Sequence, residues 1–149
     1  MSNLKVQGNA SGAGTTTLQS ANTSVSATLT LPDSTSADTL GYLNAPINEQ
    51  SAAYTAVAAD AGKVIFHPST DANARTFTIP ANASVAYPTG TVLTFINMTS
   101  QVVTIAITSD TLYQAGTGST GSRSLAQYGI ATAVKMTSTT WLISGNGLT

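Results

Sequence analysis

The chain carries very little charge. Only 7% of its 149 residues are Asp, Glu, Lys or Arg, against roughly 25% in an ordinary soluble domain. The formal net charge is −1. The basic residues stand singly, at Lys5, Lys63, Arg75, Arg123 and Lys135. This scatter lacks the basic patch with which proteins hold a nucleic-acid backbone, so we expect no nucleic-acid partner. Hydrophobic residues make up 42% of the chain, which argues against intrinsic disorder.

Other absences narrow the class further. The chain has no cysteine, which excludes disulfides and thiolate metal sites. It has no run of about 20 apolar residues, so the sequence predicts no transmembrane helix and no membrane partner. The first residues, MSNLKVQG, have no apolar stretch of the secretory kind, which predicts synthesis in a cytoplasm without Sec-type export. The low charge and these absences are consistent with a β protein that has a neutral, polar surface and belongs to a structural assembly.

Residues that carry enzyme chemistry are scarce. His67 is the only histidine, and Asp71 is the nearest acid that could orient its ring in a catalytic triad. The simpler interpretation is a polar residue that ends a strand before Pro68. Asp60 and Asp110, like Asp71, stand in predicted turns, where aspartate bonds its local backbone. A carboxylate pair for glycoside hydrolysis is conceivable, but the spacing does not favour it. We therefore expect no catalytic, cofactor-binding or metal residues.

A glycine-rich stretch and a few aromatic residues are the remaining candidates for a binding site. Residues 116–121 match the GxGxxG pattern, yet no Asp or Glu follows them, so the prediction is a loop and not a dinucleotide site. The aromatic residues that could line a sugar-binding groove are Tyr54, Tyr87, Tyr113, Tyr128 and Trp141. They fall in separate segments, which favours core or interface positions. Trp141 alternates with Ile143 and is predicted to be core.

What the chain has in abundance is β-branched residues in short runs. Strands are predicted at 63–66, 75–79, 91–97, 102–108, 130–136 and 140–144. The runs 91–97 and 102–108 should form one antiparallel hairpin, and 130–136 and 140–144 a second. The weak helix candidates are single turns at 56–60 and 124–128. Strands this short, with frequent turns, predict an all-β fold, an antiparallel sandwich or barrel.

Composition divides the chain into two zones. Residues 1–45 alternate small polar and single apolar residues, with strands predicted at 15–19 and 25–31, and form a β-rich attachment arm. Residues 46–149 form the sandwich or barrel body. Alternation within each strand predicts an inward set: Phe77, Ile79, Leu93, Phe95, Ile105, Ile107, Val134, Trp141 and Ile143. The same alternation predicts an outward set: Thr76, Thr78, Thr94, Thr104 and Thr140.

Residues 54–97 read YTAVAADAGKVIFHPSTDANARTFTIPANASVAYPTGTVLTFIN. This stretch resembles the terminal domain of tailed-bacteriophage fibre and virion proteins, with a tyrosine, a DAGK turn, RTFTIPAN and a P-x-G-T turn. The ending GSRSLAQYGIATAVKMTSTTWLISGNGLT is similar to the ending of the same family. LTLPD, at 29–33, resembles the β-repeat that precedes such domains. The resemblance covers nearly the whole chain and implies a non-enzymatic homotrimer located in the virion.

The resemblance leaves the position on the particle open. Tail fibres are long, with a docking domain and a shaft, whereas this chain begins directly in the β-repeat. We therefore expect a trimeric capsid decoration (cement) or head-fibre protein, bound to the major capsid protein or another virion protein through the arm. The alternative is a tail-fibre tip that binds a host receptor or cell-surface glycan. A glycan hydrolase is the weakest of the three expectations.

Overall fold

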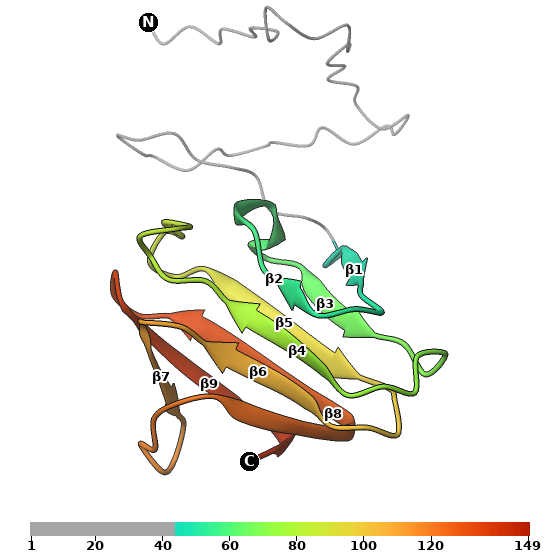
Figure 1. The fold of residues 1–149 in the computed structure, drawn as a ribbon. Helices are drawn as coiled ribbons and strands as arrows, with labels where there is room; N and C mark the ends of the chain where they lie inside the picture. Colours follow the sequence, from blue (N-terminus) through green and yellow to red (C-terminus); the bar gives the residue numbers. More distant parts are fainter. Residues whose placement is uncertain (1–43) are drawn as a thin grey trace, which may run out of the picture. The chain divides into compact units, whose positions relative to one another are not determined.

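The computed structural model describes residues 44–149, which belong to one compact unit, Leu40–Thr149. The strands predicted at 15–19 and 25–31, and nearly all of the predicted arm, lie outside the described residues. Nine strands follow in order: β1 Ile47–Glu49, β2 Tyr54–Thr55, β3 Val64–His67, β4 Arg75–Ile79, β5 Val92–Asn97, β6 Val103–Ile107, β7 Thr111–Gln114, β8 Arg123–Lys135 and β9 Thr140–Leu148 (Figure 1). One 3-10 helix, Ala58–Asp60, precedes β3. The all-β prediction is confirmed. No helix among residues 44–149 is long and apolar enough to cross a membrane.

The first six strands form two parallel groups. β1, β3 and β5 pair in parallel as a first wing, and β2, β4 and β6 pair in parallel as a second wing. Successive strands therefore belong alternately to one wing and to the other. Parallel neighbours need a crossover connection, and here each crossover is a strand of the opposite wing. The short strands thus bury their inner faces against strands distant in sequence.

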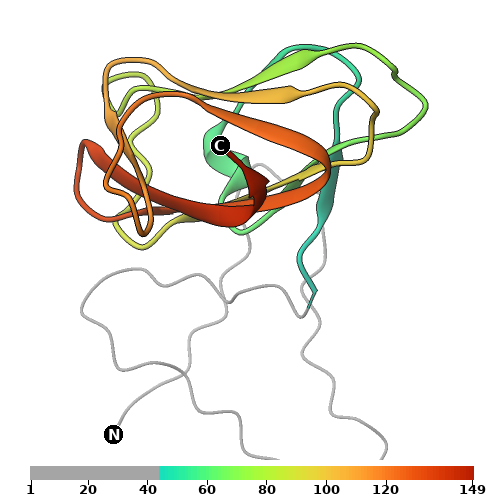
Figure 2. The ribbon, with the colours of Figure 1, turned by 90° about the horizontal axis from the view of Figure 1, so that it is seen from below.

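The long strand β8 joins the wings. Its first residues pair antiparallel with β6, and residues 129–134 pair antiparallel with β5. An irregularity between Leu125 and Ile130 separates the two halves, and Tyr128 lies there with φ 59. β9 pairs antiparallel with β8, and β7 pairs in parallel with β9. The result is one sheet that curls into a half-barrel, seen end-on in Figure 2.

The predicted pairings are partly wrong. The hairpin of 130–136 with 140–144 is confirmed, because β8 and β9 pair antiparallel there. The hairpin of 91–97 with 102–108 is wrong, because β5 pairs with β3 and β8, and β6 pairs with β4 and β8. The body is therefore a mixed sheet and not a purely antiparallel one. Of the two helix candidates, 56–60 contains the 3-10 helix, whereas 124–128 lies in β8.

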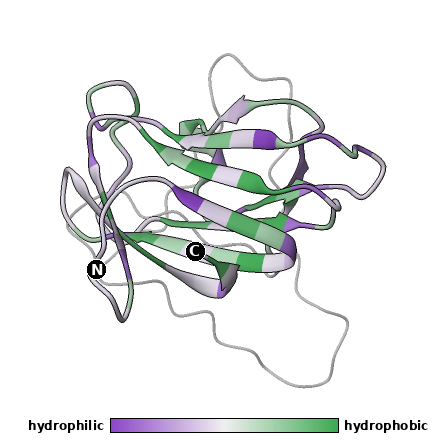
Figure 3. Cartoon of the chain, turned by 60° about the horizontal axis from the view of Figure 1, so that its bottom comes forward, coloured by the Kyte–Doolittle hydropathy of each residue, from purple (hydrophilic) through white to green (hydrophobic). Residues whose placement is uncertain are grey.

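The core lies inside the curl, and the strands alternate between it and the outside (Figure 3). Seven of the nine predicted core residues are buried: Phe77, Ile79, Leu93, Phe95, Ile105, Trp141 and Ile143. Ile107 is half-buried and packs against the core. The prediction for Val134 is wrong: Ala131 and Ala133 are its buried neighbours, and Val134 shares the outer side of β8 with Ile130. All five predicted outward threonines are exposed or half-buried.

Candidate interaction surface and polar clusters

The outer side of the first wing is mostly apolar, with Glu49 of β1 at its edge. In register across β5, β8 and β9 lie Val92, Val134 and Leu142. Four residues further along β5, Ile96 pairs with Phe66 of β3 and Ile130 of β8. We call these residues, with Val64 and the intervening Thr94 and Thr132, the apolar face. None of them is charged. Ile130 is 46% exposed and Leu142 39%.

The outer side of the second wing differs in chemistry although the strand geometry is the same. Thr55 of β2, Thr78 of β4 and Ala106 of β6 lie in one register row, and Thr76, Thr104 and Ser124 in the next. We call these residues the hydroxyl face. Hydroxyl groups can bond water directly, so this face needs no partner. Large apolar residues exposed together on the other wing are characteristic of an interaction surface.

A buried carboxylate, Asp60, ties the 3-10 helix to the edge strands of both wings. Its oxygens accept hydrogen bonds from Asn48 Nδ2 of β1 (2.9 Å), from Tyr54 Oη of β2 (2.7 Å) and from the Val57 backbone N–H (2.9 Å). Burial, and then the hydrogen bond to Asp60, raise the pKa of Tyr54. Burial also raises the pKa of Tyr87 far above its ordinary value, and its hydroxyl donates to the Val57 carbonyl (2.6 Å). The Asp60 carboxylate and the two tyrosine hydroxyls are therefore all engaged in hydrogen bonds within the fold.

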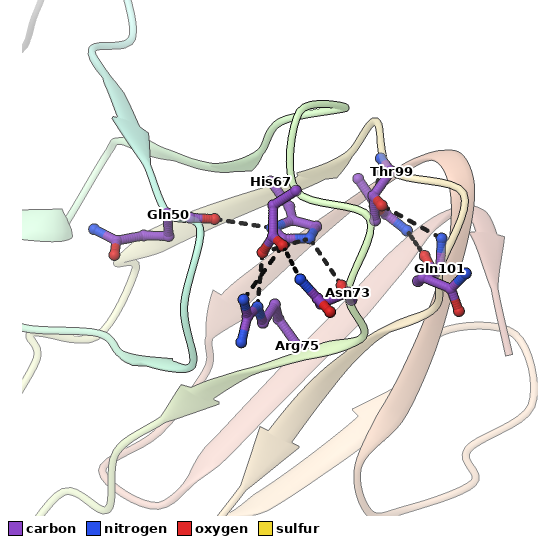
Figure 4. Close-up of polar contacts among 8 residues, drawn as sticks. Gln50, His67, Asn73, Arg75, Thr99 and Gln101 are labelled. Carbon is purple, nitrogen blue, oxygen red and sulfur yellow. Dashed lines mark hydrogen bonds and ion pairs between the residues drawn. The ribbon is translucent and has the colours of Figure 1, made fainter.

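His67 is the last residue of β3, as predicted, but it is fully buried and not a surface cap. Its Nδ1 lies 2.8 Å from the Gln50 carbonyl oxygen and its Nε2 3.2 Å from the Asn73 carbonyl oxygen (Figure 4). The ring packs edge-on against Phe77 of the second wing. Both nitrogens are therefore in contact with backbone carbonyls, and neither is hydrogen-bonded to a Ser or Thr hydroxyl among residues 44–149.

The structure brings His67 and Asp71 together, with Nε2 3.7 Å from Oδ2. Asp71 also accepts hydrogen bonds from Arg75 Nε (2.7 Å) and from Asn73 Nδ2. The Arg75 hydrogen bond, and then that of Asn73, lower the pKa of Asp71 to about 2. Arg75 begins β4, so this group of residues joins the end of β3 to the start of β4. Its contacts are those of a structural joint between the wings.

Asn97, another buried polar residue, forms hydrogen bonds within the turn from β5 to β6. The Asn97 Nδ2 donates to the carbonyls of Gln101 (2.8 Å) and Leu125 (3.0 Å), and its Oδ1 accepts from the Thr99 backbone N–H (3.0 Å). Thr99 and Gln101 are labelled in Figure 4. Asn97 thereby supplies hydrogen bonds that a hairpin would have supplied from its partner strand. It directs the chain from one wing to the other.

The inner side of β8 ends in a lysine. Lys135 is 1% exposed, and its Nζ donates to Asn82 Oδ1 (2.6 Å) and lies 5.6 Å from the centre of the Trp141 ring. Tyr87 packs edge-on against the Trp141 ring, with 5.7 Å between the ring centroids. Asp110 accepts the Asn82 backbone N–H (3.1 Å). Trp141 Nε1 finds no hydrogen-bond partner among the described residues. Trp141 is core, as predicted.

The remaining predicted candidates do not gather into one groove. Residues 116–121 form a loop between β7 and β8 with no helix after it, which confirms the loop prediction. Tyr113 lies on β7 and Tyr128 in the bulge of β8, both exposed, whereas Tyr54 and Tyr87 belong to the Asp60 cluster. A polar hollow of about 330 Å³ between β6 and the 116–122 loop contains Asp110 and several hydroxyls, but no aromatic side chain.

Asp60, Asp71 and Asp110 each have separate partners, so the structure brings no two of them together as a carboxylate pair. Among residues 44–149, no group of three or more His, Asp or Glu side chains is placed to hold a metal ion. No protein-family model matches the chain, and neither the curated proteins nor the solved structures gave a significant match.

Three features of the structure were not predicted from the sequence: the apolar face, the role of Asn97 and the burial of Lys135. The first had a signal, because both alternating sets of positions in 130–136 are mostly apolar, with Thr132 and Lys135 as the exceptions. Such a pattern is typical of a strand covered on both sides. The other two had none. An asparagine and a lysine have ordinary positions in the sequence, and only the fold buries them.

Proposed function

We propose that this chain is a non-enzymatic structural component of a bacteriophage virion, a capsid decoration or head-fibre protein that assembles as a homotrimer through the apolar face. The observation that carries the assembly is the contrast between the outer sides of the two wings. One presents hydroxyls to water, and the other presents Val, Ile, Leu and Phe in two register rows on either side of a row that contains Thr94 and Thr132. The virion assignment is supported by the resemblance of residues 54–97 and 121–149 to phage fibre domains.

A second copy of the same chain is the occupant that fits the apolar face. The residues of the face carry no charge, and Glu49 of β1, beside Phe66, lies at its edge. A single carboxylate at the edge offers little electrostatic pattern for recognising an unlike partner. Three copies can place this one face around a common axis, with each face in contact with both neighbours. Its threonines can bond across the interface, since Thr94 Oγ1 and Thr132 Oγ1 already lie 3.4 Å apart. Closed symmetry of this kind is the usual form of homo-oligomers.

A structural role is also supported by the state of the polar groups. His67 is in contact with two backbone carbonyls, and Asp60 has three donors. A general base needs a nitrogen or oxygen free to take a substrate proton. In this arrangement these side chains instead stabilise the turns between the wings. The alternative of a glycan-binding fibre tip would need an aromatic platform, and the described hollow near Asp110 has none.

Attachment to the particle is assigned to the arm, residues 1–45. The partner is the major capsid protein or another virion protein. A chain that lacks residues 1–43 should keep the β circular dichroism of the body but no longer bind particles. If the shortened chain decorates particles as well as the full chain, the arm is not the anchor.

Two measurements test the proposal as a whole. Light scattering of the full chain at micromolar concentration should give three times the chain mass, and a monomer with native circular dichroism would contradict the trimer. Immunogold labelling or cryo-electron microscopy of the virion should place the protein on the capsid exterior. Labelling of the tail tip would favour the receptor-binding alternative, and absence from the particle would overturn the virion assignment.

A further inference from the structure

Lys135 occupies a position that the fold reserves for apolar side chains. It follows Ala131 and Ala133 on the inner side of β8, and all three are buried. Lysine is almost never fully buried unless it is paired with an acid. Both ion pairs among the described residues belong to Asp71, and neither involves Lys135. A buried ammonium without a carboxylate is costly.

The amine is held against one particular group, the side-chain amide of Asn82. The Nζ–Oδ1 distance is 2.6 Å. Asn82 lies in the loop after β4, and its backbone N–H is fixed by Asp110 at 3.1 Å. The Trp141 ring, backed by Tyr87, lies beside the amine. A primary amine and a carboxamide are therefore in contact beside an aromatic wall.

We propose that Lys135 and Asn82 react to form an intramolecular isopeptide bond. The unprotonated Nζ attacks Cγ of Asn82, and a new C–N bond forms. The bond between Cγ and Nδ2 then breaks, and a proton passes from Nζ to the departing nitrogen. One amine and one primary amide thus become one secondary amide and one ammonia. No oxidant, reductant or cofactor is needed, and the inference does not depend on the virion function.

Two physical effects favour this reaction inside the fold. Holding two groups in contact makes their reaction effectively unimolecular, which can raise its rate by many orders of magnitude. The product is a neutral amide, so the cost of burying an ammonium disappears. The bond would link the end of β8 to the loop after β4, positions 53 residues apart. It would close the half-barrel covalently between β8 and the second wing.

The experiment is the mass of the full chain after prolonged incubation of the folded protein, measured in denaturant. We expect a mass lower than that of the sequence by one ammonia. Digestion with trypsin then identifies which residues the new bond joins. An unmodified chain is cut after Lys135 into 124–135 and 136–149, whereas the acylated Lys135 is not cut. The cross-linked chain should give 76–123 joined to 124–149.

Matched variants remove or keep the reacting groups. Lys135→Met and Asn82→Ala should each keep the full mass of their own sequence and the circular dichroism of the parent. Asn82→Ala should still be cut after Lys135, whereas Lys135→Met has no such site and should give 76–123 and 124–149 as separate peptides. Lys63→Arg changes a lysine outside the cluster and should still lose one ammonia. A wild-type chain with the full sequence mass and efficient cleavage after Lys135 overturns the proposal. So does a loss of ammonia that maps to peptides other than these two.

Discussion

The outer faces of the two wings are built on the same scaffold and differ in chemistry. Each wing is three short parallel strands, and each buries alternate residues inside the curl. On the second wing the residues between the buried ones are Thr, Ser and Ala. On the first wing and the adjoining strands β8 and β9 they are mostly Val, Ile, Leu and Phe. The residue types on the inner sides are determined by packing in the core. Those on the outer sides depend on what the surface contacts, either solvent or another protein.

The comparison also separates two uses of hydroxyl side chains. On the hydroxyl face, Thr76 and Thr55 are exposed to solvent. On the apolar face, Thr94 and Thr132 form a row between two apolar rows, with their hydroxyls 3.4 Å apart. A polar row inside an apolar contact can fix its register, since a misaligned partner would leave these hydroxyls unpaired. In the proposed trimer, the same residue type would face water on one wing and align the subunits on the other.

The largest expected effect concerns the core that both wings share. Phe95→Ala removes a fully buried ring from the inner side of β5 and should lower the free energy of unfolding by roughly 3 to 5 kcal/mol. Thr94→Ala, one residue away on the outer side, should cost much less. Thermal or denaturant unfolding measures both. A larger loss for Thr94→Ala would mean that the inner and outer sides of β5 are exchanged.

The second effect tests the turn by which the chain changes wings. Asn97→Ala leaves the Thr99 N–H and the carbonyls of Gln101 and Leu125 without their side-chain partner. Unpaired buried groups cost about 1 to 3 kcal/mol each, so we expect a loss of at least about 2 kcal/mol. Gln101→Ala keeps the backbone carbonyl and is the control. Equal unfolding midpoints for the two variants would show that Asn97 does not hold this turn.

The third effect compares the two faces directly. Ile130→Asp places a charge on the apolar face, and Thr76→Asp places one on the hydroxyl face. Loss of a central interface contact costs about 2 kcal/mol or more, roughly a thirtyfold weaker association. We expect Ile130→Asp to dissociate on dilution in light scattering, with circular dichroism unchanged, while Thr76→Asp stays associated. If Thr76→Asp dissociates and Ile130→Asp does not, the hydroxyl face is the interface.

Local patterns predicted the strands and most of the core, and failed where the answer depends on distant residues. Phe77, Ile79 and Leu93 are predictable because alternation in a single strand fixes their side. Val134 is not predictable in this way, because alternation alone does not tell whether Val134 or its neighbour Ala133 faces the core, and the structure buries Ala133. The parallel wings could not be predicted, since nothing in 91–97 or 102–108 marks β8 as the shared neighbour. The short segment 98–102 between two strands predicts a hairpin. Only the structure shows that Asn97 is buried and that its side chain bonds Thr99, Gln101 and Leu125.

The smallest expected effect concerns the joint between β3 and β4. Hydrogen bonds from Arg75 and Asn73 lower the pKa of Asp71 to about 2, below the roughly 3.9 of an unfolded aspartate. A carboxylate with a lowered pKa stabilises the folded state fully above its unfolded pKa, and this contribution is lost as the pH falls through the folded value. We therefore expect Asp71→Asn to be less stable than the parent near neutral pH, and the difference to shrink between about pH 4 and pH 2.

Denaturant unfolding of the parent and of Asp71→Asn across that range measures the effect. Thr70→Ala, at an exposed position of the same turn, is the control, and its difference from the parent should not change with pH. The side chain of Asp71 bonds Asn73 and Arg75 beyond the turn as well as lying beside His67. Its loss should therefore loosen the contact between the end of β3 and the start of β4, and leave the apolar face and its association unchanged. A constant difference between Asp71→Asn and the parent from pH 7 to about pH 2 would show that the carboxylate charge does not stabilise this joint.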